Sequence, residues 1–318
     1  MRDSDHNSST EIPKDPWPPL APGNSKPVLQ RGAADPFVLA HEDGWWLYAS
    51  HGAEDGGYIS IYHSTDLRNW TFVRGAVQPG SHPTSWNRRN FWAPEVARIG
   101  DLFHLYYTAM PDGTPKNEGN RVGLAVAPHP AGPFEDRGVV IPHGSIDGSP
   151  YQHTDGSWWL YFTAEHGNSL GLRAGTIGVH RLLEPDRVDE RPKLLVDRHK
   201  WQEGACILPA RDQLIMLFST GAWTNDTYAV TWATATNPDG PFHESEKILI
   251  KTTGSLYGPG HCNWFAGPGG KPWLVFHAWD ANQNARYPHV LPLRMTADGP
   301  SLQRGTPAYM FLPQTPSP

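Results

Sequence analysis

The hydrophobic pattern of this chain repeats five times as a short aromatic and aliphatic run that follows a turn and ends in a small or polar residue. The copies are Asp43–Ser50, Leu102–Thr108, Trp158–Thr163, Ile215–Ser219 and Trp273–His277. The aligned positions Leu47, Leu105, Leu160, Met216 and Leu274 lie 58, 55, 56 and 58 residues apart. Such runs, separated by turn residues at a regular period, predict repeated small antiparallel sheets.

The length of the repeat predicts the architecture. A unit of about 55 residues fits one four-stranded blade, so the sequence predicts an all-β, five-bladed β-propeller. Residues 1–30 are polar and proline-rich and are expected to form an N-terminal arm, with residues 31–318 as the single propeller domain. The expected blades are about Arg31–Gly80, Asn90–Ile141, His143–Val196, Lys200–Ile250 and Pro259–Leu312.

A second periodic feature lies just upstream of each run, where a polar residue or tryptophan stands among small or apolar neighbours. These positions are Asp35, Trp92, Asp147, Glu203 and His261, at intervals of 57, 55, 56 and 58 residues. Because the first strand of each blade lines the central channel, three acids are expected to converge at one mouth of the channel, with His261 near the axis.

Composition narrows the possible functions. The chain has a net charge of −6, no basic run and no apolar stretch long enough to span a membrane, so nucleic acid and membranes are not expected partners. The polar N-terminus lacks a secretion signal, which predicts a cytoplasmic protein unless a leader has been removed. Cys206 and Cys262 are expected to be buried free thiols. The 14 Trp residues fit a carbohydrate site or simply a Trp-rich sheet protein.

The three acids carry the functional prediction. Singly, Asp35 and Asp147 could begin turns, and Glu203 could cap or pair at the surface. Together at matching blade positions, they predict a pocket in which one carboxyl group keeps its proton near neutral pH. Pairs of carboxyl groups with separated pKa values are the groups that cleave glycosidic bonds.

The chain resembles glycoside hydrolase family 43, five-bladed propellers that act on arabinose- and xylose-containing polysaccharides. The resemblance rests on Ala34-Asp35-Pro36, Trp92-Ala93-Pro94-Glu95, Ile146-Asp147, Glu203-Gly204, Gly258-Pro259-Gly260-His261, Ala285-Arg286 and Pro292-Leu293. It implies an inverting mechanism in which Asp35 is the general base and Glu203 the general acid. Asp147 would orient Glu203 and raise its proton affinity by like-charge repulsion.

The resemblance also implies residues that bind substrate and metal. Arg286 would lie beside the terminal sugar and help to keep Asp35 ionised, while Trp92, Ala93 and, more weakly, His51 would form the wall. His261 corresponds to an axial histidine that holds a hydrated calcium ion in many relatives. The alternative is an ion-free His261 that hydrogen-bonds Glu203 or Asp147. Glu95 is expected to be structural.

The expected activity is the exo-acting release of terminal α-L-arabinofuranosyl or β-D-xylosyl units from hemicellulose-derived oligosaccharides. The loops Gly80–Arg89 and Met110–Arg121 are expected to shape the pocket rim. If they lie flat, the alternative is an endo-1,5-α-L-arabinanase with an open groove. An alternative from another class is a non-catalytic carbohydrate-binding propeller, which would have no reason to keep the three acids in step.

Overall fold

The computed structural model describes residues 32–302 except 116, 198, 254–255 and 281, together with the backbone of the short strand Tyr309–Met310. The expected N-terminal arm lies outside the described residues, as does most of the chain after residue 302.

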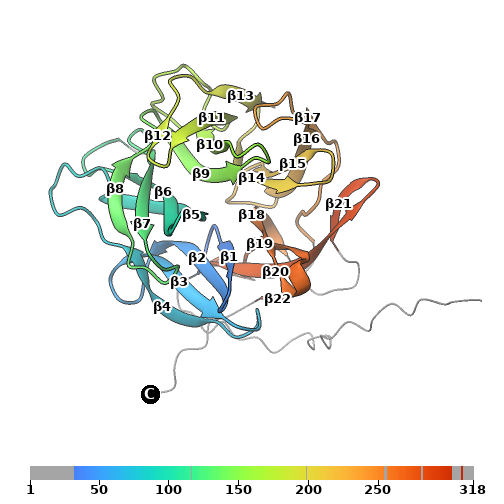
Figure 1. Ribbon diagram of the computed structural model, residues 1–318, viewed down its shortest axis with the longest axis horizontal. Helices are drawn as coiled ribbons and strands as arrows, with labels where there is room; N and C mark the ends of the chain where they lie inside the picture. Colours follow the sequence, from blue (N-terminus) through green and yellow to red (C-terminus); the bar gives the residue numbers. More distant parts are fainter. Residues whose placement is uncertain are drawn as a thin grey trace, which may run out of the picture.

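The described chain forms five antiparallel sheets arranged as blades around a central axis, which confirms the five-bladed propeller (Figure 1). Blade one contains β1 (Phe37–His41), β2 (Gly44–Gly52), β3 (Tyr58–Ser64) and β4 (Thr71–Val77). Blade two contains β5 (Arg89–Ile99), β6 (Leu102–Met110), β7 (Arg121–Ala127) and β8 (Glu135–Val139). Blade three contains β9 (Ser145–Gln152), β10 (Trp158–Ala164), β11 (Ile177–Glu184), β12 (Arg187–Val188) and β13 (Lys193–Val196).

Blade four contains β14 (Gln202–Pro209), β15 (Leu214–Thr220), β16 (Ala229–Ala235) and β17 (His243–Glu244). Blade five contains β18 (Tyr257–Ala266), the 3-10 turn η1 (Pro268–Gly270), β19 (Pro272–Trp279), β20 (Arg286–Thr296), β21 (Gly299–Leu302) and β22 (Tyr309–Met310). The strands β1, β5, β9, β14 and β18 lie innermost around the axis (Figure 1).

The repeated hydrophobic phrase forms the second strand of every blade, namely β2, β6, β10, β15 and β19. These strands have neighbours on both sides in their sheet and pack against adjacent blades, so their side chains are buried on both faces. Between blades one and two, for example, Trp46, Ile61, Phe91, Leu105 and Phe134 share one core cluster. Burial of such side chains contributes roughly 1.5–3 kcal/mol each, and the same arrangement recurs at the other blade interfaces.

Hydrogen bonds at the inner edge link the blades around the axis. The last polar residue of a repeated phrase accepts a backbone N–H from the inner strand of the following blade. The bonds are Ala93 N–H to Ser50 Oγ (2.8 Å), Asp147 N–H to Thr108 Oγ1 (3.1 Å), His261 N–H to Ser219 Oγ (2.7 Å) and Asp35 N–H to His277 Nδ1 (3.0 Å). The polar ends of the phrases therefore hold neighbouring blades in register.

The link between blades three and four differs from the other four. The N–H of Gly204 donates to Asp147 Oδ2 at 3.1 Å, and the Thr163 hydroxyl donates to the same oxygen at 3.3 Å. The Asp147 carboxylate thus replaces the side-chain acceptor found at the other interfaces. Asp147 is thereby bonded to the backbone of Gly204, the residue directly after Glu203.

The residues that donate these N–H groups all have positive φ angles, 50° at Asp35, 45° at Ala93, 57° at Asp147, 60° at Gly204 and 48° at His261. This corrects the register expected from the sequence, because Trp92 and Glu203 stand one residue before the equivalent position in their blades. A left-handed conformation costs a non-glycine residue of order 1 kcal/mol and is concentrated at functional sites. Three of these residues, Asp35, Asp147 and His261, line one pocket at the channel.

Candidate active site

A pocket of about 450 Å³ opens at the channel and brings the three predicted acids together. Asp35, Asp147 and Glu203 all line it, and each is only 8–9% exposed. The lining also includes the expected binding residues Trp92, His51, His261 and Arg286. All five blades therefore contribute polar groups to one partly dry cavity.

Positive groups surround Asp35. Arg286 Nη1 donates to its Oδ1 at 3.1 Å, His261 Nδ1 lies 3.7 Å from the same oxygen, and the Ser50 hydroxyl donates to Oδ2 at 2.6 Å. Burial opposes ionisation, but the charges of Arg286 and His261 outweigh it and hold the pKa of Asp35 well below its usual range. Asp35 is therefore a carboxylate at neutral pH, with its charge partly balanced by the arginine.

Asp147 and Glu203 lie in the opposite electrostatic environment. Burial, and then the neighbouring charges of Glu203 and Asp35, raise the pKa of Asp147 well above its usual range. Two adjacent buried anions repel each other, so Asp147 holds its proton more tightly than Asp35 does. The hydrogen bond from Gly204 N–H to Asp147 fixes the relative position of the two side chains.

Glu203 is held through both of its oxygens. The Tyr228 hydroxyl donates to Oε1 at 2.5 Å, and the indole N–H of Trp201 donates to Oε2. Neither aromatic residue was predicted from the sequence, because neither stands at a repeated position.

His261 Nδ1 lies 3.7 Å from Asp35 Oδ1, and the expected hydrogen bond from His261 to Glu203 or Asp147 stays a prediction. The residues around His261 do not fit a protein-held calcium ion. Calcium requires six to eight oxygen ligands, and the nearby Asp35 carboxylate is already bonded to Arg286 and Ser50. The positive charge of Arg286 would further oppose a divalent cation there. Calcium remains a prediction from the family resemblance alone.

The other expected wall residues separate into two groups. Trp92 is half-buried and lines the pocket, and His51 Nε2 lies 3.5 Å from Arg286 Nη2. Ala93 does not line the pocket. Its side chain is buried, and its N–H donates to Ser50. Ala93 is therefore linked to Asp35, since the Ser50 hydroxyl also donates to that carboxylate.

The structure adds an aromatic rim to the predicted site. Trp223 is 42% exposed and stacks on Trp279, with ring centroids 5.9 Å apart and an interplanar angle of 15°. The guanidinium carbon of Arg286 lies 4.7 Å from the centre of the Trp223 ring. The two long loops contribute as expected, because Arg89, Met110 and Asn117 line the same pocket.

His277 supports Asp35 from a position that the repeat marks in the sequence. His277 ends the fifth repeated phrase at the position of the serines and threonines in other blades. Its Nδ1 lies 3.0 Å from the backbone nitrogen of Asp35, whose N–H it accepts, and 3.3 Å from Asp35 Oδ1. Burial and the nearby Arg286 charge lower its pKa to about 3. His277 is thus a neutral acceptor that holds the backbone of Asp35.

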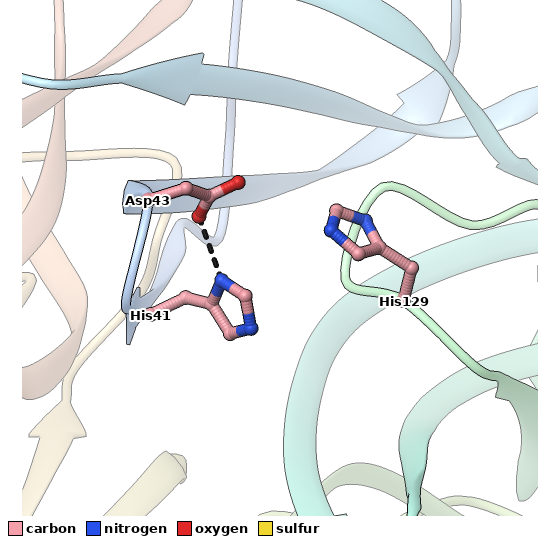
Figure 2. A group of neighbouring side chains, drawn as sticks. All are labelled: His41, Asp43 and His129. Carbon is pink, nitrogen blue, oxygen red and sulfur yellow. Dashed lines mark hydrogen bonds and ion pairs between the residues drawn. The ribbon is translucent and has the colours of Figure 1, made fainter.

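Within the described part of the chain, a single group of histidine and acidic side chains has the spacing of a metal site. His41, Asp43 and His129 place their ligand atoms within 4.8 Å of one another (Figure 2). His41 is hydrogen-bonded to Asp43, and His129 Nδ1 accepts the N–H of Ala131 at 3.1 Å. Neutral His129 therefore has its hydrogen on the other ring nitrogen, which does not suit metal binding. None of the three lines the pocket.

The two cysteines are buried and free, as expected, and Cys206 Sγ lies 3.4 Å from the carbonyl oxygen of Cys262. No helix in the described residues is long and apolar enough to cross a membrane.

The family model of glycosyl hydrolases family 43 matches residues 24–300, and the chain belongs to this family. The protein is therefore a glycosidase by family. Several relatives show how far its members diverge in the reactions for which they are named.

The chain is 27% identical over 279 residues to the β-D-galactofuranosidase xynD of Aspergillus niger, covering 82% of this chain and 78% of that protein. It is 27% identical over 289 residues to the extracellular exo-α-(1→5)-L-arabinofuranosidase ArbA of Cellvibrio japonicus, covering 79% and 80%. It is 23% identical over 274 residues to the extracellular endo-α-(1→5)-L-arabinanase 1 of Bacillus subtilis, covering 79% and 81%. Two of these three names describe extracellular proteins, and none supports the cytoplasmic placement expected from the N-terminus.

Solved structures support the fold. A thermostable family-43 glycoside hydrolase superposes with a TM-score of 0.76 at 21% identity, covering 91% of this chain and 99% of that one. An α-L-arabinanase of Cellvibrio cellulosa, solved with arabinohexaose, superposes with a TM-score of 0.72 at 21% identity, covering 90% and 100%.

Proposed function

We propose that the protein is an inverting, exo-acting glycosidase that removes terminal α-L-arabinofuranosyl or β-D-xylosyl units from hemicellulose-derived oligosaccharides. The observation that carries this proposal is the separation of protonation states within one pocket. Arg286 and His261 hold the pKa of Asp35 below its usual range, whereas burial and the neighbouring Glu203 raise the pKa of Asp147. A glycosidase needs both a base and an acid at the same pH.

Each side chain then has a defined part in the reaction. Asp35 accepts a proton from a water molecule as that water attacks the anomeric carbon. Glu203 gives its proton to the glycosidic oxygen as the bond to the leaving group breaks. Asp147 holds the backbone after Glu203 and, by its charge, favours the protonated acid.

Support for the substrate class comes from the relatives and from the pocket. One relative is named as an exo-acting arabinofuranosidase, which fits a pocket walled by Trp92 and by residues of the two long loops. A furanosyl or xylosyl ring presents several hydroxyl groups that the polar side chains of Arg286, Asp35 and His51 would bind. Trp223 offers an exposed ring face at the rim.

Two other specificities have specific support. The name of the Aspergillus relative makes terminal β-D-galactofuranosyl units a candidate substrate. The Bacillus relative is named as an endo-arabinanase, so cleavage inside arabinan is the alternative mode of action.

The test is hydrolysis of p-nitrophenyl α-L-arabinofuranoside, β-D-xyloside and β-D-galactofuranoside by the full chain, with arabinan viscosity measured in parallel. The proposal predicts release of p-nitrophenol from the arabinofuranoside or the xyloside, with slow loss of viscosity. Turnover of the galactofuranoside alone would reassign the sugar. A rapid fall in arabinan viscosity would establish endo action, and inactivity in every assay would leave the carbohydrate-binding alternative.

A further inference from the structure

Tyr228 lies deep in the pocket wall, directly before β16, and the proposed mechanism has not yet used it. Its side chain is fully buried, and its hydroxyl lies 2.5 Å from Glu203 Oε1. This is the closest contact that Glu203 makes with a group able both to donate and to accept a hydrogen bond.

The other oxygen of Glu203, Oε2, has a partner that can only donate a hydrogen bond. The indole N–H of Trp201 donates to Oε2, and an indole cannot accept a hydrogen bond in return. Oε2 is therefore held as an acceptor whether or not Glu203 is protonated. Oε1 is the oxygen whose hydrogen bond can reverse direction when the proton moves.

Tyr228 has a second partner in the side chain of Ser219, whose Oγ accepts the N–H of His261 at 2.7 Å. Burial, followed by the charge of Glu203, raises the pKa of Tyr228 well above its usual range, so the tyrosine keeps its hydrogen. The Ser219 contact acts in the opposite direction, as expected of a hydroxyl that donates to the tyrosine oxygen. The hydrogen of the Tyr228 hydroxyl is therefore available for Glu203 Oε1 once Glu203 is an anion.

We propose that Tyr228 is a positioning residue for the acid, one that stabilises the Glu203 carboxylate formed when the proton passes to the leaving group. The inference rests on the proposed function. Glu203 loses its proton to the glycosidic oxygen as the carbon–oxygen bond breaks, and the proton of the attacking water goes to Asp35. Tyr228 loses no proton and only turns its O–H toward Glu203 Oε1.

The packing around Tyr228 fixes the position of this hydroxyl. The ring stacks on His277, with centroids 5.9 Å apart and an interplanar angle of 16°, and His277 in turn holds the backbone of Asp35. On another side the ring lies so close to Gly260 that a Cβ there would come within 1.9 Å of it. Tyr228 therefore contacts both Glu203, the proposed acid, and His277, which holds the backbone of Asp35, the proposed base.

The experiment compares wild type and Tyr228→Phe on aryl glycosides with graded leaving groups. Dinitrophenyl leaving groups need little protonation, whereas phenyl and sugar leaving groups depend on it. We expect kcat of Tyr228→Phe to fall at least about 10-fold for phenyl and sugar leaving groups and less than about threefold for dinitrophenyl, with KM little changed. Equal losses on all substrates, or no loss on any, would overturn the inference.

Tyr161→Phe is the matched control, because Tyr161 is also fully buried and donates its hydroxyl to the carbonyl oxygen of Pro238, away from the pocket. It should leave the dependence on the leaving group unchanged. If Tyr228→Phe does not fold, m-fluorotyrosine at position 228 keeps the shape and is a stronger donor. That variant should respond less steeply to the leaving group than wild type, and an unchanged response would overturn the inference.

The outcomes distinguish this inference from the proposed function. An inactive wild type on every aryl glycoside contradicts the proposed function itself. An active wild type whose leaving-group dependence is shared by Tyr228→Phe contradicts only the role of Tyr228. In a Glu203→Gln background, Tyr228→Phe should add little further loss, because it acts through Glu203.

Discussion

At the scale of single residues, Glu203 and Asp35 have opposite tasks in the proposed mechanism, and separate substitutions can distinguish them. Glu203→Gln removes the transferable proton but keeps the size of the side chain. We expect kcat on phenyl and natural glycosides to fall by about 10²–10⁴-fold, with a much smaller loss on dinitrophenyl glycosides. Steady-state kinetics on the two substrate types measures this difference.

The control for Glu203→Gln is Glu165→Gln, since Glu165 is another buried acid that lines the pocket and is bonded to Asn120. Any fall in kcat of Glu165→Gln should be the same for both substrate types. Equal losses on both substrate types in Glu203→Gln would remove Glu203 from the acid role.

Asp35→Asn should lose most of its activity on every substrate, because water must be activated whatever group leaves. We expect a loss of about 10²–10⁴-fold in kcat for all aryl glycosides. Asp212→Asn, at an exposed turn between β14 and β15, serves as the control and should behave as wild type. A substantially active Asp35→Asn protein would contradict the assignment of the base.

The sequence predicted the acids and Arg286 but not the aromatic residues that hold Glu203. Asp35, Asp147 and Glu203 could be found because they recur at the blade period to within one residue. Tyr228 and Trp201 could not, because neither lies in a repeated phrase or at the polar position before it. Trp223 likewise lies in a connection between strands, where no periodicity applies.

At the scale of strands, the last residue of each repeated phrase fixes the channel mouth. Thr108 accepts the N–H of Asp147, and its side chain is fully buried. Thr108→Val keeps the shape but leaves a buried donor unpaired, which costs roughly 1–3 kcal/mol. We expect a lower melting temperature together with a loss of activity, because Asp147 moves relative to Glu203.

Thr231→Val provides the comparison for Thr108→Val. Thr231 is also fully buried but donates to the carbonyl oxygen of Lys247, outside the pocket. It should lower the melting temperature without lowering kcat. If the two variants lost activity equally, the link between the phrase ends and the site would be wrong.

The phrase ends also show what a period can and cannot predict at this scale. The spacing correctly predicted the second strand of every blade and the inner strand before it. It placed Trp92 and Glu203 one position off, because the equivalent positions in blades two and four are Ala93 and Gly204. Neither residue carries a polar side chain that would mark the position in the sequence.

At the scale of the whole molecule, buried titratable groups couple stability to pH. His289 is buried in β20 against Phe276, and burial lowers its pKa to about 4. The unfolded chain, with a pKa near 6.5, binds more protons than the folded one between these values, so stability falls as pH drops below about 6.5. From pH 6.5 to 5 this single group should cost roughly 1.5 kcal/mol.

Comparison of wild type with His289→Phe isolates the contribution of His289 to the pH dependence of stability. The comparison is necessary because burial raises the pKa of Glu95 to about 8, and a raised carboxyl pKa makes stability fall as pH rises instead. Denaturant unfolding at the two pH values should show wild type losing more stability than His289→Phe. A variant with the same pH dependence as wild type would contradict the burial of a neutral His289.

Calcium binding would affect the stability of the whole molecule, because an ion that binds only the folded state stabilises it. The residues around His261 give it no support, so we expect a chelator to leave both the melting temperature and the rate unchanged. A loss of either that calcium restores would establish the ion.

The stereochemistry of hydrolysis tests the central claim most directly, because it requires turnover and reports how water attacks. Proton NMR of the first product formed from p-nitrophenyl α-L-arabinofuranoside, or from the β-D-xyloside if that is the better substrate, distinguishes the two anomers. The account predicts that the sugar appears first with inverted configuration, as β-L-arabinose or α-D-xylose, since Asp35 directs water rather than attacking the sugar. Release with retained configuration would contradict it.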